Sequence, residues 1–261
     1  MTIWVDPPTW PAHGRLWSHV ISDTSLEELH AFAVAAGIPD RSFEGDHYDI
    51  PEHRHTDVVA AGAIPVSGRD VARKLAASGL RFRKRKGERP LGRYPDGLAA
   101  VGGPHTLDVI ASPHEPIAAA GAAVVLICDE SRIVLVRNES RPGWAPPGGK
   151  REAGESIRET AVREAHEETS LVLAPFDLVP VGYERITIAP GAARGIWRDG
   201  DNHLAVLGVQ LRQPAPVRTM SPDVLEAAWF DVDQVHRLCA TQPWWPLVVI
   251  WLERLRIAPA P

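Results

Sequence analysis

The feature that most restricts how this chain can fold is a cluster of glutamates in the segment GKREAGESIRETAVREAHEETSL, residues 149–171. Glu164, Glu167 and Glu168 follow the spacing i, i+3 and i+4, which places three carboxylates on one face of a helix. Like charges packed in this way repel one another and destabilise an isolated helix. The segment therefore predicts a helix at about 156–169 whose acidic face meets a counter-charge, and a hard divalent cation suits three carboxylates best.

The residues before this helix favour a close approach of the backbone to an anion. The stretch 144–149 reads WAPPGG and leads directly into the helical segment. Glycines allow the backbone to come close to a phosphate group, and N–H groups near the start of a helix can point at it. We therefore expect Gly148 and Gly149 to bind substrate, and Arg163 to pair with a carboxylate and orient it.

Taken together, the segment resembles the Nudix box, whose pattern is G-x5-E-x7-R-E-apolar-x-E-E-x-G-apolar. The positions in register are Gly149, Glu155, Arg163, Glu164, Glu167, Glu168 and Leu171. Two positions differ from the family pattern: Ser170 replaces the last glycine, and Ala165 fills the aliphatic position. A left-handed conformation at position 170 would cost a serine roughly 1 kcal/mol.

The resemblance covers about residues 117–257 and implies an α/β (α+β) Nudix fold, a mixed β-sheet sandwiched between helices. It further implies that Glu164, Glu167 and Glu168 bind Mg²⁺ or Mn²⁺, and that Glu168, Glu164 and Arg163 act in catalysis. Water would attack a phosphoanhydride bond in line, with Glu168 or Glu184 as the general base. The substrate class would be a nucleoside diphosphate-linked compound or a nucleoside triphosphate.

The identity of the substrate is poorly determined by the sequence. The loop expected at 189–202 contains Trp197, a candidate for base stacking, with Arg194 and Arg198 beside it as candidates for phosphate or ribose contacts. Trp144 is a second stacking candidate, and burial in the core is an equally good interpretation of it. The alternative function is a non-catalytic, nucleotide-sensing Nudix module coupled to an N-terminal domain that acts on a partner or on nucleic acid.

Three regions follow one another along the chain. Residues 1–80 form a small domain rich in histidine, and residues 81–116 read as a basic linker rich in Gly and Pro. Residues 117–261 form the Nudix domain. Expected strands lie at 118–128, 133–137, 178–188, 203–212 and 227–230, and expected helices at 25–36, 67–77, 231–240 and 245–256.

The N-terminal region resembles a small family of unknown function (DUF4031-like) found in actinobacterial and phage proteins, and we expect an α/β domain there. The resemblance rests on the stretches DPPTWPAHGRLWSHVISDTSLEELHAFA and DHYDIP. The stretch up to residue 49 contains seven side chains that could bind zinc, manganese or iron. They are His13, His19, Asp23, His30, Asp46, His47 and Asp49. Their spacing matches no metal signature, so a metal site and a polar network remain alternatives.

Composition limits the other classes of function. The net charge of −5 argues against nucleic-acid binding as a main role, because such binding usually needs a basic stripe. The start of the chain shows no secretory pattern, and no apolar run is long enough to span a membrane. A cytoplasmic protein acting on a nucleotide-type small molecule is the expectation, with a homodimer possible.

Overall fold

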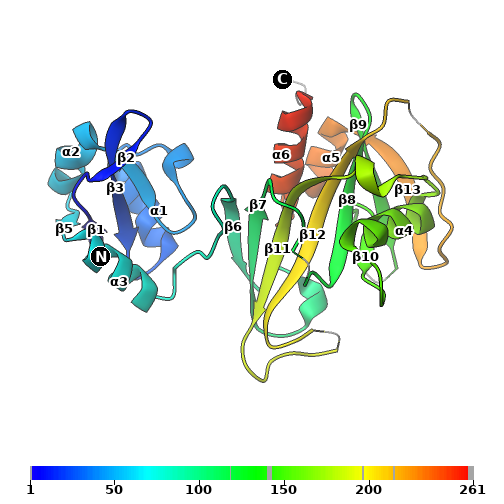
Figure 1. Cartoon of the computed structure of the whole chain (residues 1–261), viewed down its shortest axis with the longest axis horizontal. Helices are drawn as coiled ribbons and strands as arrows, with labels where there is room; N and C mark the ends of the chain where they lie inside the picture. Colours follow the sequence, from blue (N-terminus) through cyan, green and yellow to red (C-terminus); the bar gives the residue numbers. More distant parts are fainter. Residues whose placement is uncertain (1, 118, 140–142, 196, 214, 258–261) are drawn as a thin grey trace. The chain divides into compact units, whose positions relative to one another are not determined.

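The computed structural model describes residues 2–117, 119–139, 143–195, 197–213 and 215–257. The chain divides into two compact units, Met1–Arg85 and Lys86–Pro261 (Figure 1). Each unit has its own buried apolar cluster, around Leu29 and Tyr48 in the first and around Leu135 and Val206 in the second. A separate core in each unit supports treating them as two domains.

Unit 1 is an α/β domain built on a five-stranded sheet. The strand order is β2-β3-β1-β5. Strand β4 lies off this path and pairs with residues 17–20 of β3. Neighbouring strands run antiparallel except β1 and β5, which are parallel. The strands are β1 (Ile3–Val5), β2 (Trp10–Ala12), β3 (Arg15–Ser22), β4 (Tyr48–Pro51) and β5 (Ile64–Pro65).

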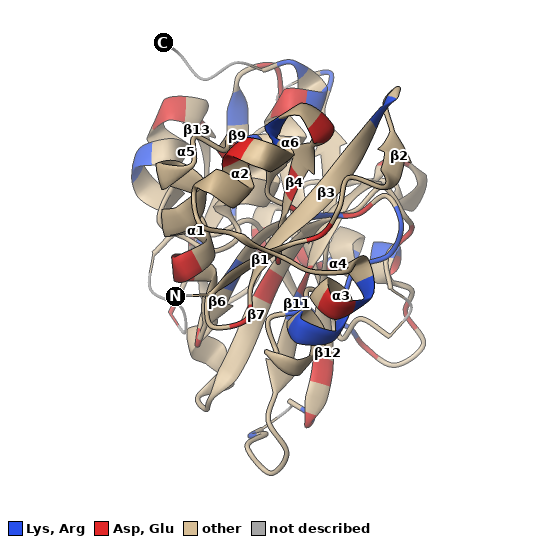
Figure 2. Cartoon of the chain, turned by 90° about the vertical axis from the view of Figure 1, so that its left-hand side faces the viewer, with Lys and Arg blue, Asp and Glu red and all other residues tan. Residues whose placement is uncertain are grey.

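Helices α1 (Leu26–Ala35) and α3 (Gly68–Ala77) confirm the two helices expected in this unit. Ser25 caps the first and Ser67 the second, each accepting a hydrogen bond from the third residue of its helix. The short α2 (His55–Ala60) and two 3₁₀ turns, Asp40–Ser42 and Glu52–Arg54, complete the unit. Figure 2 shows the helices around the strands, with basic and acidic residues both present on α3.

Unit 2 is built on an eight-stranded mixed sheet. The strand order is β13-β9-β8-β12-β11-β7-β6, with β10 pairing with β8. The pairing of β8 with β12 is parallel, and the other pairings are antiparallel. The strands are β6 (Arg89–Pro95), β7 (His105–Ala111), β8 (Ala122–Cys128), β9 (Arg132–Asn138), β10 (Gly148–Lys150), β11 (Val179–Ile188), β12 (Gly200–Gln210) and β13 (Val224–Asp231).

Helices cover both faces of this sheet. Helix α4 (Ile157–Thr169) packs on the face that presents Ala123, Val125 and Ala205. Helices α5 (Val232–Cys239) and α6 (Trp245–Leu255) pack on the opposite face, against Leu126 and Val206 (Figure 1). Two 3₁₀ turns, Ala99–Val101 and Pro175–Asp177, belong to the connections. A mixed sheet between helices is the architecture that the box implied.

The region 81–116 is not a linker, which corrects the sequence-based expectation. Strands β6 and β7 lie inside it, and β7 pairs with both β6 and β11. Two features of the sequence prevented the prediction of these strands. Strand β6 contains Pro90 and Pro95, which an edge strand tolerates. Strand β7 contains Asp108, a charge in the middle of a buried strand, which is neutralised there by Arg93 and Arg185.

The other strands and helices expected in unit 2 are present with shifted bounds: β13 begins at Val224, three residues before its expected start, and β10 was not expected as a strand. Strand β12 begins at Gly200, so the last residues of the expected loop 189–202 belong to the sheet. Residue 118, where the first strand was expected to start, lies outside the described residues. Among the described residues, no helix combines the length and the apolar character needed to cross a membrane.

Ser170, which replaces the last glycine of the box pattern, ends α4 in the left-handed conformation, with φ 60° and ψ 7°. We expect Ser170→Gly to raise the free energy of unfolding by about 1 kcal/mol, because glycine carries no Cβ penalty there. Ser170→Ala is the matched control, because it removes the hydroxyl but keeps the Cβ. Urea denaturation of the three proteins measures the effect. A lower stability of Ser170→Gly would contradict the strain argument.

Candidate active site

Helix α4 starts at a capping box that fixes its position along the chain. The Ser156 side chain accepts from the Glu159 N–H at 3.2 Å, and the Glu159 carboxylate accepts from the Ser156 N–H at 2.7 Å. The helix therefore begins at Ile157, and the three glutamates of the cluster fall in its second half. This positions them beside strand β10, which packs against α4.

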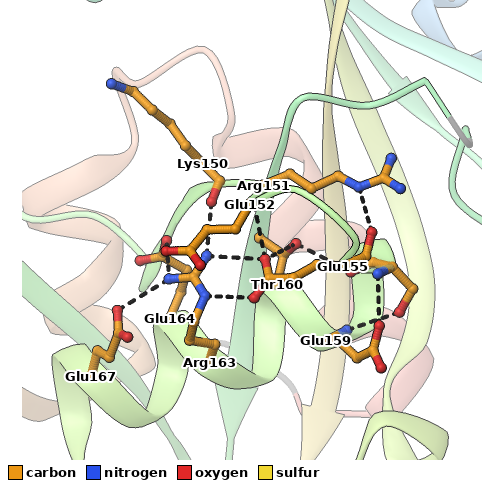
Figure 3. Close-up of polar contacts among 10 residues, drawn as sticks. Lys150, Arg151, Glu152, Glu155, Glu159, Thr160, Arg163, Glu164 and Glu167 are labelled. Carbon is orange, nitrogen blue, oxygen red and sulfur yellow. Dashed lines mark hydrogen bonds and ion pairs between the residues drawn. The ribbon is translucent and has the colours of Figure 1, made fainter.

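Arg163 is the centre of the polar contacts on α4. Its guanidinium donates to Glu155 at 2.7 Å, to Glu164 at 2.9 Å and to Glu167 at 3.1 Å (Figure 3). It also donates to the carbonyl of Lys150 at 2.8 Å, which ties the helix to β10. The hydrogen bond from Arg163 is the main reason that the pKa of Glu155 is lowered to about 2. Arg163 thus pairs with the carboxylates, and its role in catalysis stays a prediction.

Glu168 is 5% exposed. One carboxylate oxygen accepts from the Asn138 side chain at 3.0 Å, and the other accepts from the Gly148 N–H at 2.9 Å. Asn138 closes strand β9, and the sequence analysis did not identify it. Its only sequence signal is an amide at the end of an apolar strand, which has no distinctive spacing from the box.

Gly148 and Gly149 are needed because α4 and β8 approach β10 closely. A Cβ at position 148 would overlap the carbonyl oxygen of Ala123, and a Cβ at position 149 would overlap the carboxylate of Glu164. The N–H of Gly148 is used by Glu168 and is not free for a phosphate group. The glycines therefore have a packing role in this structure, and their contact with substrate stays a prediction.

The glutamates of α4 suit a divalent metal ion by the chemistry of their oxygens. In the described residues, Glu164, Glu167 and Glu168 do not form a set with ligand atoms all within 4.8 Å of one another. Arg163 holds two of them and β10 holds the third. Burial, together with the nearby charges of Glu168 and Glu167, raises the pKa of Glu164 although Arg163 lowers it. The cluster therefore carries more negative charge than Arg163 offsets, and hard oxygen donors fit Mg²⁺ or Mn²⁺.

Glu184, the alternative general base, lies in the middle of β11 and is 4% exposed. Burial raises its pKa to about 7. It shares a face of the sheet with Ile186 and Ile188, which pack in the cluster that contains α6 residues. Helix α4 packs on the other face, so Glu184 and the α4 glutamates are separated by the sheet.

The raised pKa of Glu184 predicts a pH-dependent loss of stability. The folded protein keeps its proton up to about pH 7, while an unfolded glutamate loses it near pH 4.3. The folded state then binds more protons in this window, so stability falls as pH rises through it. We expect Glu184→Gln to gain stability over the wild type between pH 5 and 8, by at most about 3 kcal/mol.

Chemical denaturation at pH 5 and pH 8 measures this difference for Glu184→Gln and the wild type. Glu253→Gln, which changes an exposed carboxylate of the same unit, is the control and should show no such trend. An equal effect of Glu184→Gln at both pH values would show that the carboxyl of Glu184 does not titrate in this range.

Three of the aromatic and basic candidates for substrate binding, Trp197, Arg194 and Arg198, lie in the loop between β11 and β12. Trp197 is half-buried, and its indole N–H donates to the carbonyl of Ala100 at 3.1 Å. Arg194 and Arg198 are exposed, and Arg194 donates to carbonyls of its own turn. Trp144 packs edge-on against Phe230 at 4.6 Å between ring centroids, which favours its structural interpretation. No contact joins these residues to the α4 glutamates in the described structure, and their binding roles stay predictions.

In unit 1, the structure brings part of the His and Asp set together. His19, His47 and Asp49 place ligand atoms within 4.8 Å of one another. Burial lowers the pKa of His47, but its hydrogen bonds to Asp46 and Asp49 outweigh this and raise it to about 9. The carboxylates of Asp46 and Asp49 therefore stabilise a positive charge at the His47 ring.

The other members of that set lie outside the group. His13 is in a turn, with φ 51°. Asp23 faces Lys74 at 3.9 Å. His30 is exposed and its ring bonds the hydroxyl of Tyr48 at 2.7 Å. The set identified from composition is thus reduced to three converging side chains, supported by Asp6 and Asp46.

Comparisons with known proteins give family matches for both units. The sequence model of the NUDIX domain matches residues 118–248. The model described as "Protein of unknown function (DUF4031)" matches residues 3–78. Both matches agree with the resemblances identified from sequence motifs.

Relatives in Bacillus subtilis (strain 168) match shorter parts of the chain. One is a "Putative 8-oxo-dGTP diphosphatase", 45% identical over 49 residues, which are 19% of this chain and 33% of that protein. Another is the "Uncharacterized Nudix hydrolase YvcI", 39% identical over 44 residues, which are 17% and 28% of the two chains. The chain thus spans about a third of the length of the curated relatives it matches.

Solved structures are similar at low sequence identity. A Caenorhabditis elegans Ap4A hydrolase in a binary complex is 17% identical and has a TM-score of 0.41 over 52% of this chain and 96% of that one. A NUDIX hydrolase from Nitrosomonas europaea is 20% identical and has a TM-score of 0.40 over 53% and 92% of the two chains. Because the NUDIX model matches half of the sequence and the box residues occupy α4 and β10 as its pattern requires, the chain belongs to the Nudix family.

Proposed function

We propose that unit 2 is a divalent-metal-dependent hydrolase that cleaves a phosphoanhydride bond in a nucleoside triphosphate or a nucleoside diphosphate-linked substrate. The observation that carries the proposal is the acidic face of α4, where Arg163 holds Glu155, Glu164 and Glu167 while Glu168 is bound to β10. A network of this kind positions carboxylates and leaves excess negative charge, which is the chemistry that a metal-bound diphosphate requires.

In this proposal Glu164, Glu167 and Glu168 hold Mg²⁺ or Mn²⁺. When bound, the ion supplies charge neutralisation for the phosphate oxygens and a site for the attacking water. Arg163 keeps the glutamate side chains in their rotamers through three carboxylate contacts and one carbonyl contact. Gly149 allows Glu164 to lie directly against the backbone of β10.

Glu168 is the better of the two candidates for the general base. Its carboxylate lies on α4, and its hydrogen bonds to Asn138 and Gly148 fix its orientation. Glu184 lies on the opposite face of the sheet from α4. A base has to be within hydrogen-bond reach of the water it activates, or one water away, so the position of Glu168 favours it.

The substrate class is supported by the short match to the putative 8-oxo-dGTP diphosphatase, which names a nucleoside triphosphate for that protein. For base and phosphate contacts in this chain we propose Trp197, Arg194 and Arg198. Their loop is tied together by Asp199, which accepts from the Gly191 and Ala193 N–H groups at 2.7 and 3.1 Å.

The test is a phosphate- and pyrophosphate-release screen of the full chain against nucleoside triphosphates, dinucleoside polyphosphates and nucleoside diphosphate sugars, each with Mg²⁺ or Mn²⁺. We expect metal-dependent release with at least one class. Retention of the full set of box carboxylates favours this outcome over a nucleotide-sensing module. Tight nucleotide binding without release under any metal would support the sensing alternative and overturn the hydrolase.

A further inference from the structure

We propose that unit 1 binds a divalent transition metal ion of the zinc class through His19, His47 and Asp49. The Nε2 atoms of both histidines face the same Asp49 oxygen, at 3.9 Å for His19 and 3.4 Å for His47. All three ligand atoms lie within 4.8 Å of one another. Two imidazoles and one carboxylate are a donor set that zinc, iron and manganese share.

The spacing of these atoms is close to that of a bound site. Tetrahedral ligands at about 2.1 Å from a metal lie about 3.4 Å from each other. The His47–Asp49 separation of 3.4 Å has that value already, and the His19–Asp49 separation of 3.9 Å exceeds it by half an ångström. The half-exposed Asp49 side chain can rotate toward His19 without a change of the backbone, which shortens the longer of these two separations.

Two buried aspartates orient the histidines. Asp6 contacts Nδ1 of His19 at 2.9 Å, and Asp46 contacts Nδ1 of His47 at 2.5 Å. Each aspartate is 2% exposed in its side chain and is also fixed by a backbone N–H, from His19 and Phe82 respectively. A carboxylate on Nδ1 holds a proton there, so Nε2 is the nitrogen left for a metal ion, which takes the place of the second proton of a protonated ring; this arrangement is found behind metal-binding histidines.

The fold brings these residues together from three parts of the chain. His19 and Asp49 are direct partners in the register of β3 and β4, and His47 precedes β4 by one residue. Asp6 follows the last residue of β1. Strand β4 lies beside β3 in unit 1 (Figure 2). Because strand pairing fixes the ligands, the site is held by rigid elements.

A pocket of about 320 Å³ adjoins this cluster and indicates the ligand class. Asp49 lines it together with His53 and the basic residues Arg15, Arg41 and Arg54. Three protein ligands leave coordination positions open on the metal, as in catalytic sites. Guanidinium groups suit an anionic oxygen ligand such as a phosphate ester, and Asp49 is the metal ligand that this pocket shares with the cluster.

The test measures metal binding by the full chain, with Zn²⁺ by equilibrium dialysis and with Co²⁺ by its visible absorption. Glu164→Gln/Glu167→Gln is the background, because it weakens the α4 site. We expect about one ion per chain in this background. His47→Ala and Asp49→Asn should each lower its affinity at least about a hundredfold, and Asp46→Asn by about tenfold.

His30→Gln is the matched control, because it changes another histidine of unit 1 outside the cluster, and it should bind the ion like the background protein. Near-UV circular dichroism reports whether each variant is folded. If His47→Ala does not fold, Asp49→Asn, which changes a half-exposed side chain, tests the site.

Inorganic phosphate should shift the Co²⁺ absorption, and Arg41→Gln should reduce this shift. An unshifted spectrum would overturn the anionic-ligand assignment. Absence of a bound ion in the background protein, or unchanged affinity in folded Asp49→Asn, would overturn the metal site.

Discussion

Glu167→Gln lowers metal-dependent turnover by at least about a hundredfold and leaves the fold intact. The expected loss follows from the charge compensation that a metal ion supplies in phosphoryl transfer, which is worth several kcal/mol. The fold is preserved because the side chain of Glu167 is 49% exposed and its contact with Arg163 is a surface pair of small energy. Steady-state kinetics under saturating Mg²⁺ or Mn²⁺, with the substrate found in the nucleotide screen, measures the change.

Glu152→Gln is the matched control, because it removes an exposed carboxylate beside the same network and should keep wild-type turnover (Figure 3). Glu168→Gln should lower turnover as strongly as Glu167→Gln. It also loses stability, because the buried Gly148 N–H then bonds a neutral oxygen. Wild-type rates in Glu167→Gln and Glu168→Gln would mean that α4 is an acidic helix without a metal role.

The roles of the α4 residues were predictable because they depend on the spacing of residues that are close together in the sequence. Periodicity fixed one helix face for the three glutamates, and the Ser156 and Glu159 pair marks the start of the helix. The left-handed Ser170 was predictable from the position where the family pattern has glycine. Each of these features depends on residues fewer than five positions apart, or on a pattern of fixed length.

The partners of these residues come from distant parts of the chain and were not predictable. Asn138 reaches Glu168 across 30 positions, and nothing in its own neighbourhood distinguishes it. Gly148 was interpreted as a phosphate contact because a glycine before a helix commonly is one. Its actual constraint is the backbone of β8, which only the pairing of β10 with β8 reveals.

The same limit explains the histidines of unit 1. Composition identified seven candidate ligands, but strand register determines which of them meet. His19 and Asp49 are 30 positions apart and become neighbours through the pairing of β3 with β4. Strands of three or four residues such as β2 and β4 show too little alternation to be recognised from sequence.

A chain truncated to residues 86–261 is expected to fold and keep the hydrolase activity, whereas a chain truncated to residues 117–261 is expected not to fold. The difference is β6 and β7, which the sequence analysis placed in a linker. Leu107, Val109 and Ile110 are each at most 1% exposed. Full burial of such side chains contributes about 1.5–3 kcal/mol each.

Removal of β7 also removes Asp108, which pairs with Arg185 in the neighbouring strand β11, and makes β11 an open edge of the sheet. These losses together reach the whole stability of an ordinary domain, about 5–15 kcal/mol. Circular dichroism and thermal melting of the two truncated chains measure the outcome, and the full chain is the reference. A cooperative melt of residues 117–261 near that of residues 86–261 would show that β6 and β7 are dispensable and that the domain boundary lies near residue 117 after all. Loss of folding in residues 86–261 would show instead that unit 2 depends on unit 1.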